Sequence, residues 1–417
     1  MKKATLPHSV TNLWVNLFAL LLGFIAMLFC YKAELASVHL LFIGLLTYST
    51  PIFIYEFLNL KKESLPKPKQ AFEWQDLLSK LLGFYVTLAI VLFGYWLFPE
   101  YLKPLYFPYW DFITLLALFI MLTAPLYFIY MHLNNPDKDA YWLIGKIVCL
   151  DKAQALRKFK QPHFVLTQHF LGWLVKAFFL PIMYVFLFKN LDFLYQTQTT
   201  QWQTVPTLFI ATITWLYSID LFVGVIGYLC TFKLFNTHIR SVDTTLFGWV
   251  VCVLCYTPFN DAILTHYLDW MKAQTSWIGW IHYKTLTMIW CATALFLLLI
   301  YVLSTVVFGV RFSNLTHRGI ITNGPYRFTK HPAYVSKNIF WWLTTVPFAY
   351  ISTQPYMSIK AIFFLSGVSF IYYLRAKTEE AHLSQDPVYV EYALWMNEHG
   401  IFAWLGKKLP FLQYRSY

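Results

Sequence analysis

Long apolar stretches recur along this sequence and limit it to one class of fold. Runs of about 20 mostly apolar residues, the length at which a helix crosses a bilayer, follow one another from residue 12 to residue 374. Of the 417 residues, 58% are hydrophobic and 12% are charged, whereas a soluble domain has about 25% charged residues. The sequence therefore predicts an all-α, polytopic integral membrane protein.

Ten of these stretches are predicted to cross the membrane. Their expected bounds are 12–31, 37–59, 77–98, 109–132, 164–188, 204–230, 245–267, 284–310, 336–353 and 356–374. Gln354-Pro355 separates the last two, which predicts a tight helical hairpin. We therefore expect an N-terminal transmembrane region of eight spans, residues 1–310, and a C-terminal region, residues 311–417, with the hairpin and a tail.

The positions of the 32 Lys and Arg residues predict how the chain is oriented. If the N-terminus lies in the cytoplasm and ten spans alternate, most of these residues fall in cytoplasmic segments, as the positive-inside rule requires. The same rule explains the net charge of +12, so we expect no nucleic-acid partner. Both termini are predicted to be cytoplasmic, with the protein in the inner membrane if the organism is bacterial.

A few polar residues fall inside the predicted spans. Placing a polar side chain in the bilayer costs free energy, so each of these residues is expected to have a structural or functional role. Asp220 lies in the sixth span and Lys176 in the fifth, so an ion pair between them is conceivable. They would belong to a head-group pocket or a relay, or they would serve interhelical hydrogen bonding. Cys252 and Cys255 have CxxC spacing but no second pair, so no metal site is predicted.

A polar, basic loop interrupts the apolar pattern before the ninth span. It reads Asn323-Gly-Pro-Tyr-Arg-Phe-Thr-Lys-His-Pro-Ala-Tyr334. Its Asn-Gly-Pro start predicts a turn, and Pro332 can begin the next helix, whose free N–H groups favour anions. Arg327, Lys330 and His331 are cationic or donor groups suited to a carboxylate or phosphate. The alternative is an ordinary positive-inside loop with an incidental His.

A second charged cluster follows the tenth span. It reads Arg375-Ala-Lys-Thr-Glu-Glu380. Arg375 and Glu379 are four residues apart on an expected helix, so they can pair on one face. Glu380 points about 100° away and can bind something else. The alternative is a charged interfacial helix that only marks the membrane boundary.

Together the two clusters resemble the isoprenylcysteine carboxyl methyltransferase family over about residues 320–392. Phospholipid N-methyltransferases share a looser form of the pattern. The motifs that carry the resemblance are Gly324-Pro-Tyr-Arg, His331-Pro-Ala-Tyr334, Arg375-x3-Glu379-Glu380-x2-Leu383 and Tyr389-x2-Tyr392.

The resemblance implies an S-adenosylmethionine-dependent methyltransferase. Its cofactor pocket would face the cytosol, and a lipophilic acceptor, an isoprenoid or a lipid, would reach it from the bilayer. By the same resemblance, Tyr326, His331, Pro332 and Tyr334 would shape the cofactor pocket, and Glu379 or Glu380 would complete it.

The resemblance also assigns catalytic residues. Arg375 and Glu380 match the family's Arg–Glu pair near the acceptor, and Arg327 and Lys330 would bind substrate. A carboxylate acceptor needs a cation to orient it, which an Arg fork supplies, whereas an amine acceptor must lose a proton to a base. Carboxyl O-methylation is favoured, and the amine stays open. Lys330 and Ser336 depart from the family's usual Arg and Gly, which bears on the identity of the substrate.

Two other functions are compatible with parts of the sequence. Integral-membrane sterol reductases also have about ten spans, a basic His-Pro-x-Tyr unit and an acidic tail motif, but bind NADPH. A non-catalytic transporter or scaffold is the third reading, suggested by Asp220 and Lys176. The sequence specifies neither the oligomeric state nor the methyl acceptor.

Overall fold

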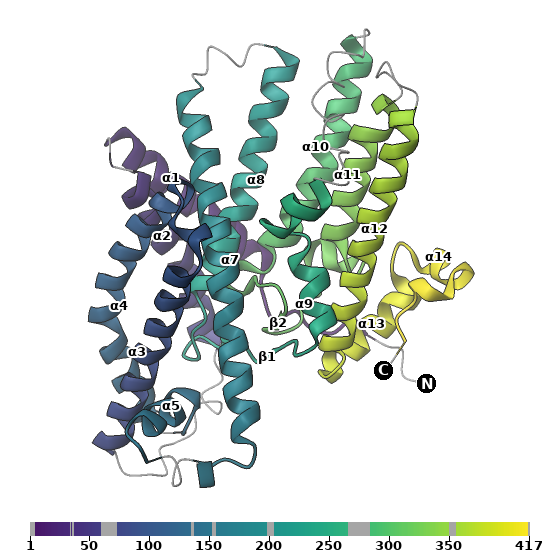
Figure 1. Ribbon diagram of the computed structural model, residues 1–417. Helices are drawn as coiled ribbons and strands as arrows, with labels where there is room; N and C mark the ends of the chain where they lie inside the picture. The colour runs from purple at the N-terminus through teal and green to yellow at the C-terminus, as the bar shows by residue number, and fades with distance from the viewer. Residues whose placement is uncertain are drawn as a thin grey trace. The chain divides into compact units, whose positions relative to one another are not determined.

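The computed structural model is almost entirely helical (Figure 1). It describes residues 5–33, 35, 37–59, 73–134, 137–151, 156–197, 204–265, 284–349 and 356–415. These residues fall into two compact units, which we describe separately. Unit 1 comprises residues 1–18, 186–227 and 242–417, and unit 2 comprises residues 19–185 and 228–241.

Seven of the described helices are long and apolar enough to cross a membrane. They confirm an all-α, multi-pass membrane protein, and they correspond to the first six predicted spans and to the eighth. The seven are α1 (Leu13–Lys32), α2 (Ser37–Asn59), α3 (Trp74–Leu97), α4 (Phe107–Asn134), α7 (Pro162–Gln196), α8 (Val205–Leu229) and α10 (Lys284–Val306).

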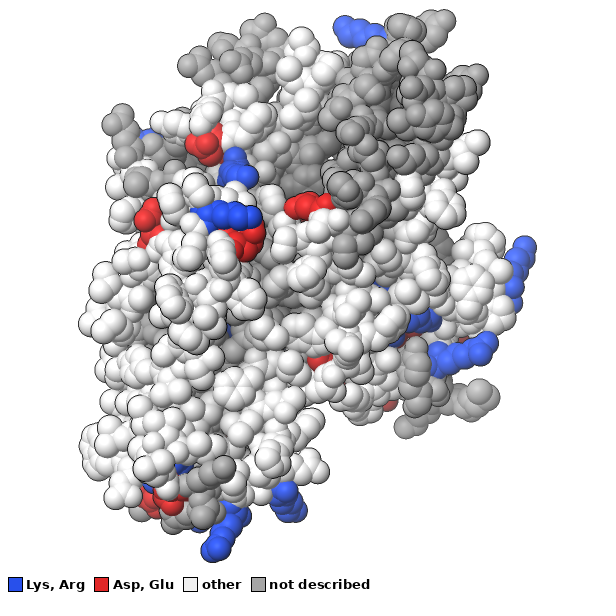
Figure 2. All heavy atoms as spheres, viewed as in Figure 1, with Lys and Arg blue, Asp and Glu red and all other residues white. Residues whose placement is uncertain are grey.

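Unit 2 is built on close packing between α3 and the short helix α5 (Ala140–Val148). Gly83 and Gly145 allow this approach, because a Cβ on either residue would lie 1.9 Å from a backbone oxygen of the other helix. At the end of the contact, Asp76 accepts a hydrogen bond from Trp142 Nε1 at 2.6 Å. Figure 2 shows that the middle of this unit's surface is largely uncharged, as a lipid-facing surface requires.

Asp220 and Lys176 each have partners within their own unit. In unit 1, Asp220 accepts hydrogen bonds from Tyr301 Oη at 2.7 Å and from Thr305 Oγ1 at 2.5 Å. In unit 2, Lys176 Nζ donates to Thr231 Oγ1 at 2.5 Å and lies 4.3 Å from the ring of Trp173. Interhelical hydrogen bonding, one of the two interpretations left open above, therefore accounts for Asp220.

The seventh predicted span, 245–267, is wrong as one continuous helix. Helix α9 (Leu246–Val253) begins after Thr245, whose side chain caps it by accepting from Gly248 N, and ends after eight residues. Turns and a π-helical segment (Asn260–Thr265) follow. Pro258 contributes to this break, because it has no N–H to donate and its ring clashes with a helical carbonyl four residues earlier. Proline alone is not sufficient, since Pro51, Pro125 and Pro181 lie inside the continuous helices α2, α4 and α7.

The segment just before α9 and the segment just after α10 nevertheless lie side by side, at the same end of unit 1. The amide of Asp243, just before α9, donates to Leu315 O at 2.9 Å, just after α10. Strands β1 (Ser241–Val242) and β2 (Thr316–His317) pair beside this bond. Helix α10 rises about 35 Å over its 23 residues. The chain between Asp243 and the start of α10 must therefore span the same distance in the opposite direction. An even number of membrane crossings, with both termini on one side, stays our prediction.

Three neighbouring helices of unit 1, α10, α11 (Pro332–Ala349) and α12 (Tyr356–Leu383), run side by side (Figure 1). Helices α11 and α12 occupy the places of the ninth and tenth predicted spans, while Gln354-Pro355 lies outside the described residues. Neither is among the seven apolar helices found within the described residues; α11 carries several polar residues along its length. Helix α12 extends beyond its predicted end at residue 374, so the second charged cluster lies on its last turns.

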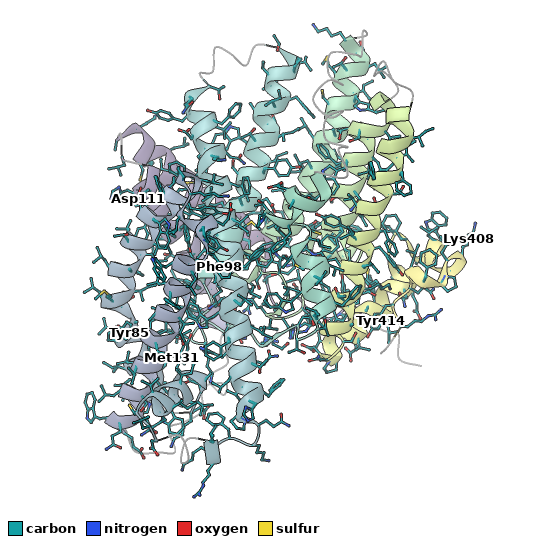
Figure 3. All side chains as sticks on the ribbon, in the orientation of Figure 1. Tyr85, Phe98, Asp111, Met131, Lys408 and Tyr414 are labelled. Atoms are coloured by element: carbon teal, nitrogen blue, oxygen red, sulfur yellow. The ribbon has the colours of Figure 1, made fainter. Side chains whose placement is uncertain are left out.

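Helix α13 (Pro387–His399) follows α12 after a turn, and Asp386 caps its first turn by accepting from Val388 N at 2.9 Å. Helix α14 (Ala403–Lys408) ends the helical part, with Lys408 projecting from it in Figure 3. Tyr414 folds back toward α13 (Figure 3), where the Asn397 side chain donates to the Tyr414 carbonyl and accepts from the Tyr414 N–H. This places the C-terminal segment over the polar end of α12.

Candidate active site

The polar loop is held in place by residues near the N-terminus. Val10 N donates to Ile320 O at 3.1 Å, and the Thr322 side chain donates to the carbonyl of Pro7 at 2.7 Å. Gly324 has a φ of +55°, which favours glycine, and begins a short 3-10 turn (Gly324–Arg327). The predicted turn is thus present, and it delivers the residues that follow to the start of α11.

Glu380 is the most enclosed charged group of this region, with only 2% of its side chain exposed. Its Oε1 lies 2.6 Å from Lys330 Nζ and 3.2 Å from His331 Nε2, and its Oε2 lies 2.8 Å from Lys377 Nζ. Burial alone would raise the pKa of Glu380, but the hydrogen bond and charge of His331, together with Lys330, outweigh it and hold the pKa well below its usual range. Glu380 therefore ties the loop to α12 and does not pair with Arg375.

We expect this carboxylate to make stability fall in acid. Because the folded pKa of Glu380 is depressed, its contribution is present above the unfolded value of about 4.3 and is lost as pH falls toward the folded value. Between about pH 5 and pH 3, the melting temperature in detergent should fall more steeply for the wild type than for Glu380→Gln. Parallel curves would contradict the assigned role.

Arg375 is the second buried charge, and it faces a different set of partners. Its Nε lies 3.5 Å from Glu379 Oε1, which confirms the predicted pairing four residues apart. Its Nη2 donates to Asn314 Oδ1 at 2.6 Å, and its guanidinium lies between the rings of Tyr256 and Tyr334, at 5.3 and 5.0 Å. These contacts fix the plane of the guanidinium, which is the property needed to orient a carboxylate.

Glu379 is more accessible than Glu380, since 29% of its side chain is exposed. It accepts a hydrogen bond from the hydroxyl of Tyr334 and lies 3.9 Å from His331 Nδ1. The rings of His331 and Tyr334 stack with centroids 5.6 Å apart. One carboxylate, two rings and one guanidinium thus form a single polar surface at the junction of α11 and α12.

A cavity of about 170 Å³, which we call cavity 1, opens beside this surface. Its lining includes six of the nine residues singled out from the sequence: Tyr326, Lys330, His331, Tyr334, Arg375 and Glu379. The other three are not among the residues that line it: Arg327 is exposed at the surface, Pro332 begins α11, and Glu380 faces the other side.

Helix α13 closes cavity 1 on the loop side. Tyr392 is buried and its hydroxyl donates to the carbonyl of Tyr326 at 2.6 Å. Tyr389 is buried next to it, and both tyrosines line the cavity. The two tyrosines of the predicted tail motif thus hold the loop against α12 through packing and one hydrogen bond.

A second cavity of about 400 Å³, cavity 2, lies on the other side of the same wall. Lys330, His331, Tyr334 and Tyr372 line both cavities. The remaining lining of cavity 2 is mainly apolar and comes from α11 and α12 and from the C-terminal segment, with Val335, Ile339, Phe402, Leu405 and Leu412 among its members. The site therefore has a polar compartment and a mainly apolar one.

Several residues that build the site were not singled out from the sequence. Asn314 and Tyr256 position Arg375, and Lys377 pairs with Glu380. The i,i+3 spacing of Lys377 and Glu380 could have indicated that pair. No local spacing links Asn314 or Tyr256 to α12, so only the fold reveals them.

The comparison with known families agrees with this geometry. Residues 284–385 match the model of the isoprenylcysteine carboxyl methyltransferase (ICMT) family. The ICMT match confirms the resemblance and extends it upstream to the start of α10, while Tyr389 and Tyr392 lie beyond it. No curated protein and no solved structure matches the chain. The match supports a membrane methyltransferase.

Proposed function

We propose that this protein is an integral membrane S-adenosylmethionine-dependent methyltransferase that acts on a lipophilic acceptor. The observation that supports this most directly is cavity 1, where both ICMT-like motifs contribute to one lining. The loop supplies Tyr326 and His331, and the end of α12 supplies Arg375 and Glu379. In this proposal the pocket faces the cytoplasm, as the distribution of basic residues predicts.

The side chains of cavity 1 suit the parts of this cofactor. S-adenosylmethionine supplies a methyl group on a positively charged sulfonium, and it also carries an amino acid moiety and an adenine. Glu379, partly exposed and held by Tyr334, is placed to bind an ammonium group. Tyr326 and Tyr389 offer ring faces for a cation or a base. His331 and Lys330 complete the rim.

We assign the orientation of the acceptor to Arg375. Its guanidinium is fixed by Asn314 and by two tyrosine rings before any ligand binds. Binding of the acceptor therefore costs little conformational entropy of the Arg375 side chain. A carboxylate acceptor would be held by such a fork without needing a base. The mainly apolar lining of cavity 2 is suited to the lipophilic part of the acceptor.

The first test is cofactor binding by purified protein in detergent. We expect titration calorimetry to show binding of S-adenosylmethionine and none of NADPH. Glu379→Gln should weaken binding of S-adenosylmethionine roughly 10- to 100-fold, because a charged hydrogen bond is lost. Glu391→Gln, an exposed carboxylate on α13, is the matched control and should bind like the wild type. Tight NADPH binding without S-adenosylmethionine binding would instead favour a reductase.

A further inference from the structure

The chain after α13 exposes a cluster of large apolar side chains. We call residues 401–412 the α14 segment; it contains α14 and the short 3-10 turn Pro410–Leu412. Its exposed apolar side chains include Ile401, Phe402, Trp404, Leu409 and Phe411. Of the two largest rings, 59% of Trp404 and 56% of Phe411 are exposed. So many exposed apolar side chains in a short segment indicate an interaction surface.

The α14 segment lies at the level where the apolar part of α12 ends. The hydroxyl of Tyr373 donates to Phe411 O at 3.0 Å, and the two ring centroids are 6.1 Å apart. One turn further along α12, Lys377 Nζ donates to Gln413 O at 3.1 Å. The tenth span is predicted to end at residue 374, so these contacts place the segment at the boundary between the hydrocarbon core and the head groups.

A row of aromatic rings connects the exposed side of α12 with the α14 segment. Phe363 and Phe370 on α12 are exposed, and we expect both to face lipid. The ring of Phe370 stacks on that of Tyr373 with centroids 6.1 Å apart, and Tyr373 in turn packs against Phe411. Lipid that covers Phe370 can therefore also cover Phe411. Aromatic side chains are favoured at this depth because they tolerate both hydrocarbon and water.

The charged side chains of this region are all basic. Residues 400–417 contain Lys407, Lys408 and Arg415 and no Asp or Glu. All three basic residues are exposed, and Lys408 Nζ lies 5.8 Å from the ring of Trp404. Figure 2 shows basic side chains at the outer edge of α14, beside an uncharged surface. Exposed rings next to lysines are typical of segments that lie in the head-group region of an anionic bilayer.

We propose that the α14 segment binds the surface of a bilayer that contains anionic lipids. The rings of Trp404 and Phe411 enter the head-group region, and the ammonium groups of Lys407 and Lys408 bind lipid phosphates. This inference does not depend on the proposed methyltransferase function. The segment also lines cavity 2, so its binding to the bilayer holds one wall of that cavity in place.

The test is hydrogen–deuterium exchange of the full chain in nanodiscs that each hold a single copy. One set contains phosphatidylcholine alone, and the other contains an equal mixture with phosphatidylglycerol. We expect amides of residues 401–412 to exchange at least about tenfold more slowly in the mixture, because each basic residue near an anionic surface strengthens binding roughly fivefold. High salt should reduce this difference by screening the charges.

Two double variants carry the same change of charge at different places. Lys407→Gln with Lys408→Gln should remove the difference between the two lipid compositions. Lys158→Gln with Lys160→Gln, which replaces two exposed lysines of unit 2, is the matched control and should retain it.

Three outcomes would overturn the proposal. The first is equal exchange of residues 401–412 in the two lipid compositions. The second is a difference that persists when Lys407 and Lys408 are both replaced. The third is protection that is equal in both compositions and, in detergent, increases with protein concentration. That result would identify the α14 segment as a contact between two copies of the chain.

Discussion

Replacing Glu380 by Gln is expected to destabilise the folded protein by about 3–5 kcal/mol, the cost of removing one partner of a buried ion pair. Glu380 lies beside Lys330, Lys377 and His331 with almost no exposure, so the substitution leaves the two lysines without their counter-charge. The loop and the end of α12 should separate, and binding of S-adenosylmethionine should be lost as a consequence. Thermal unfolding in detergent, followed by circular dichroism, measures the first effect.

The matched control for Glu380 is Glu391→Gln. Glu391 is exposed, so its substitution should change stability by less than about 0.5 kcal/mol. A Glu380→Gln variant that melts like this control, yet fails to bind the cofactor, would show that Glu380 contacts the ligand directly. That result would return Glu380 to the catalytic role that the sequence suggests.

Replacing Arg375 by Lys is expected to lower methyl transfer by about 100-fold or more, because loss of orientation at a reacting group has effects of this size. Lys keeps the charge but cannot make the paired contacts to Asn314 and Glu379 or lie flat between two rings. The measurement is incorporation of radiolabelled methyl groups from S-adenosylmethionine into a total lipid extract. The wild type should label the extract, and Arg375→Lys should not.

Arg327→Lys is the control for Arg375. The sequence indicates both arginines as ligand-binding residues, but Arg327 is exposed and does not line either cavity within the described part of the chain. We expect Arg327→Lys to retain wild-type methyl transfer. If it loses activity as Arg375→Lys does, the loop must rearrange when ligands bind, and our assignment of Arg375 as the orienting residue loses its main support.

Hydropathy was sufficient for most of the fold and insufficient at one place. Six predicted spans before residue 231 and the one beginning at Lys284 agree with described helices because each is a long apolar run. The stretch from residue 245 is equally apolar, yet α9 stops after eight residues. A window that averages hydropathy gives little weight to one proline, whereas an interior proline such as Pro258 can kink or end a helix.

The candidate site was predictable where its contacts are local. The Arg375–Glu379 pair follows from a spacing of four residues on a helix. The pairing of Lys330 with Glu380 joins positions 50 residues apart, and Asn314 reaches Arg375 from another segment. Lys337 was counted only as one more basic residue, because composition cannot tell a solvated lysine from one that lies beside the rings of Tyr301, Trp341 and Tyr372.

The hydrogen bonds between the N-terminal segment and the polar loop have a consequence for experiments on sidedness. Asn323 donates to the carbonyl of Thr11 at 2.7 Å, and Thr322 donates to that of Pro7. Two segments bonded in this way must emerge from the same leaflet, whatever the number of crossings between them. An epitope fused ahead of Met1 would therefore report, through protease protection in sealed vesicles, which compartment the loop and cavity 1 face.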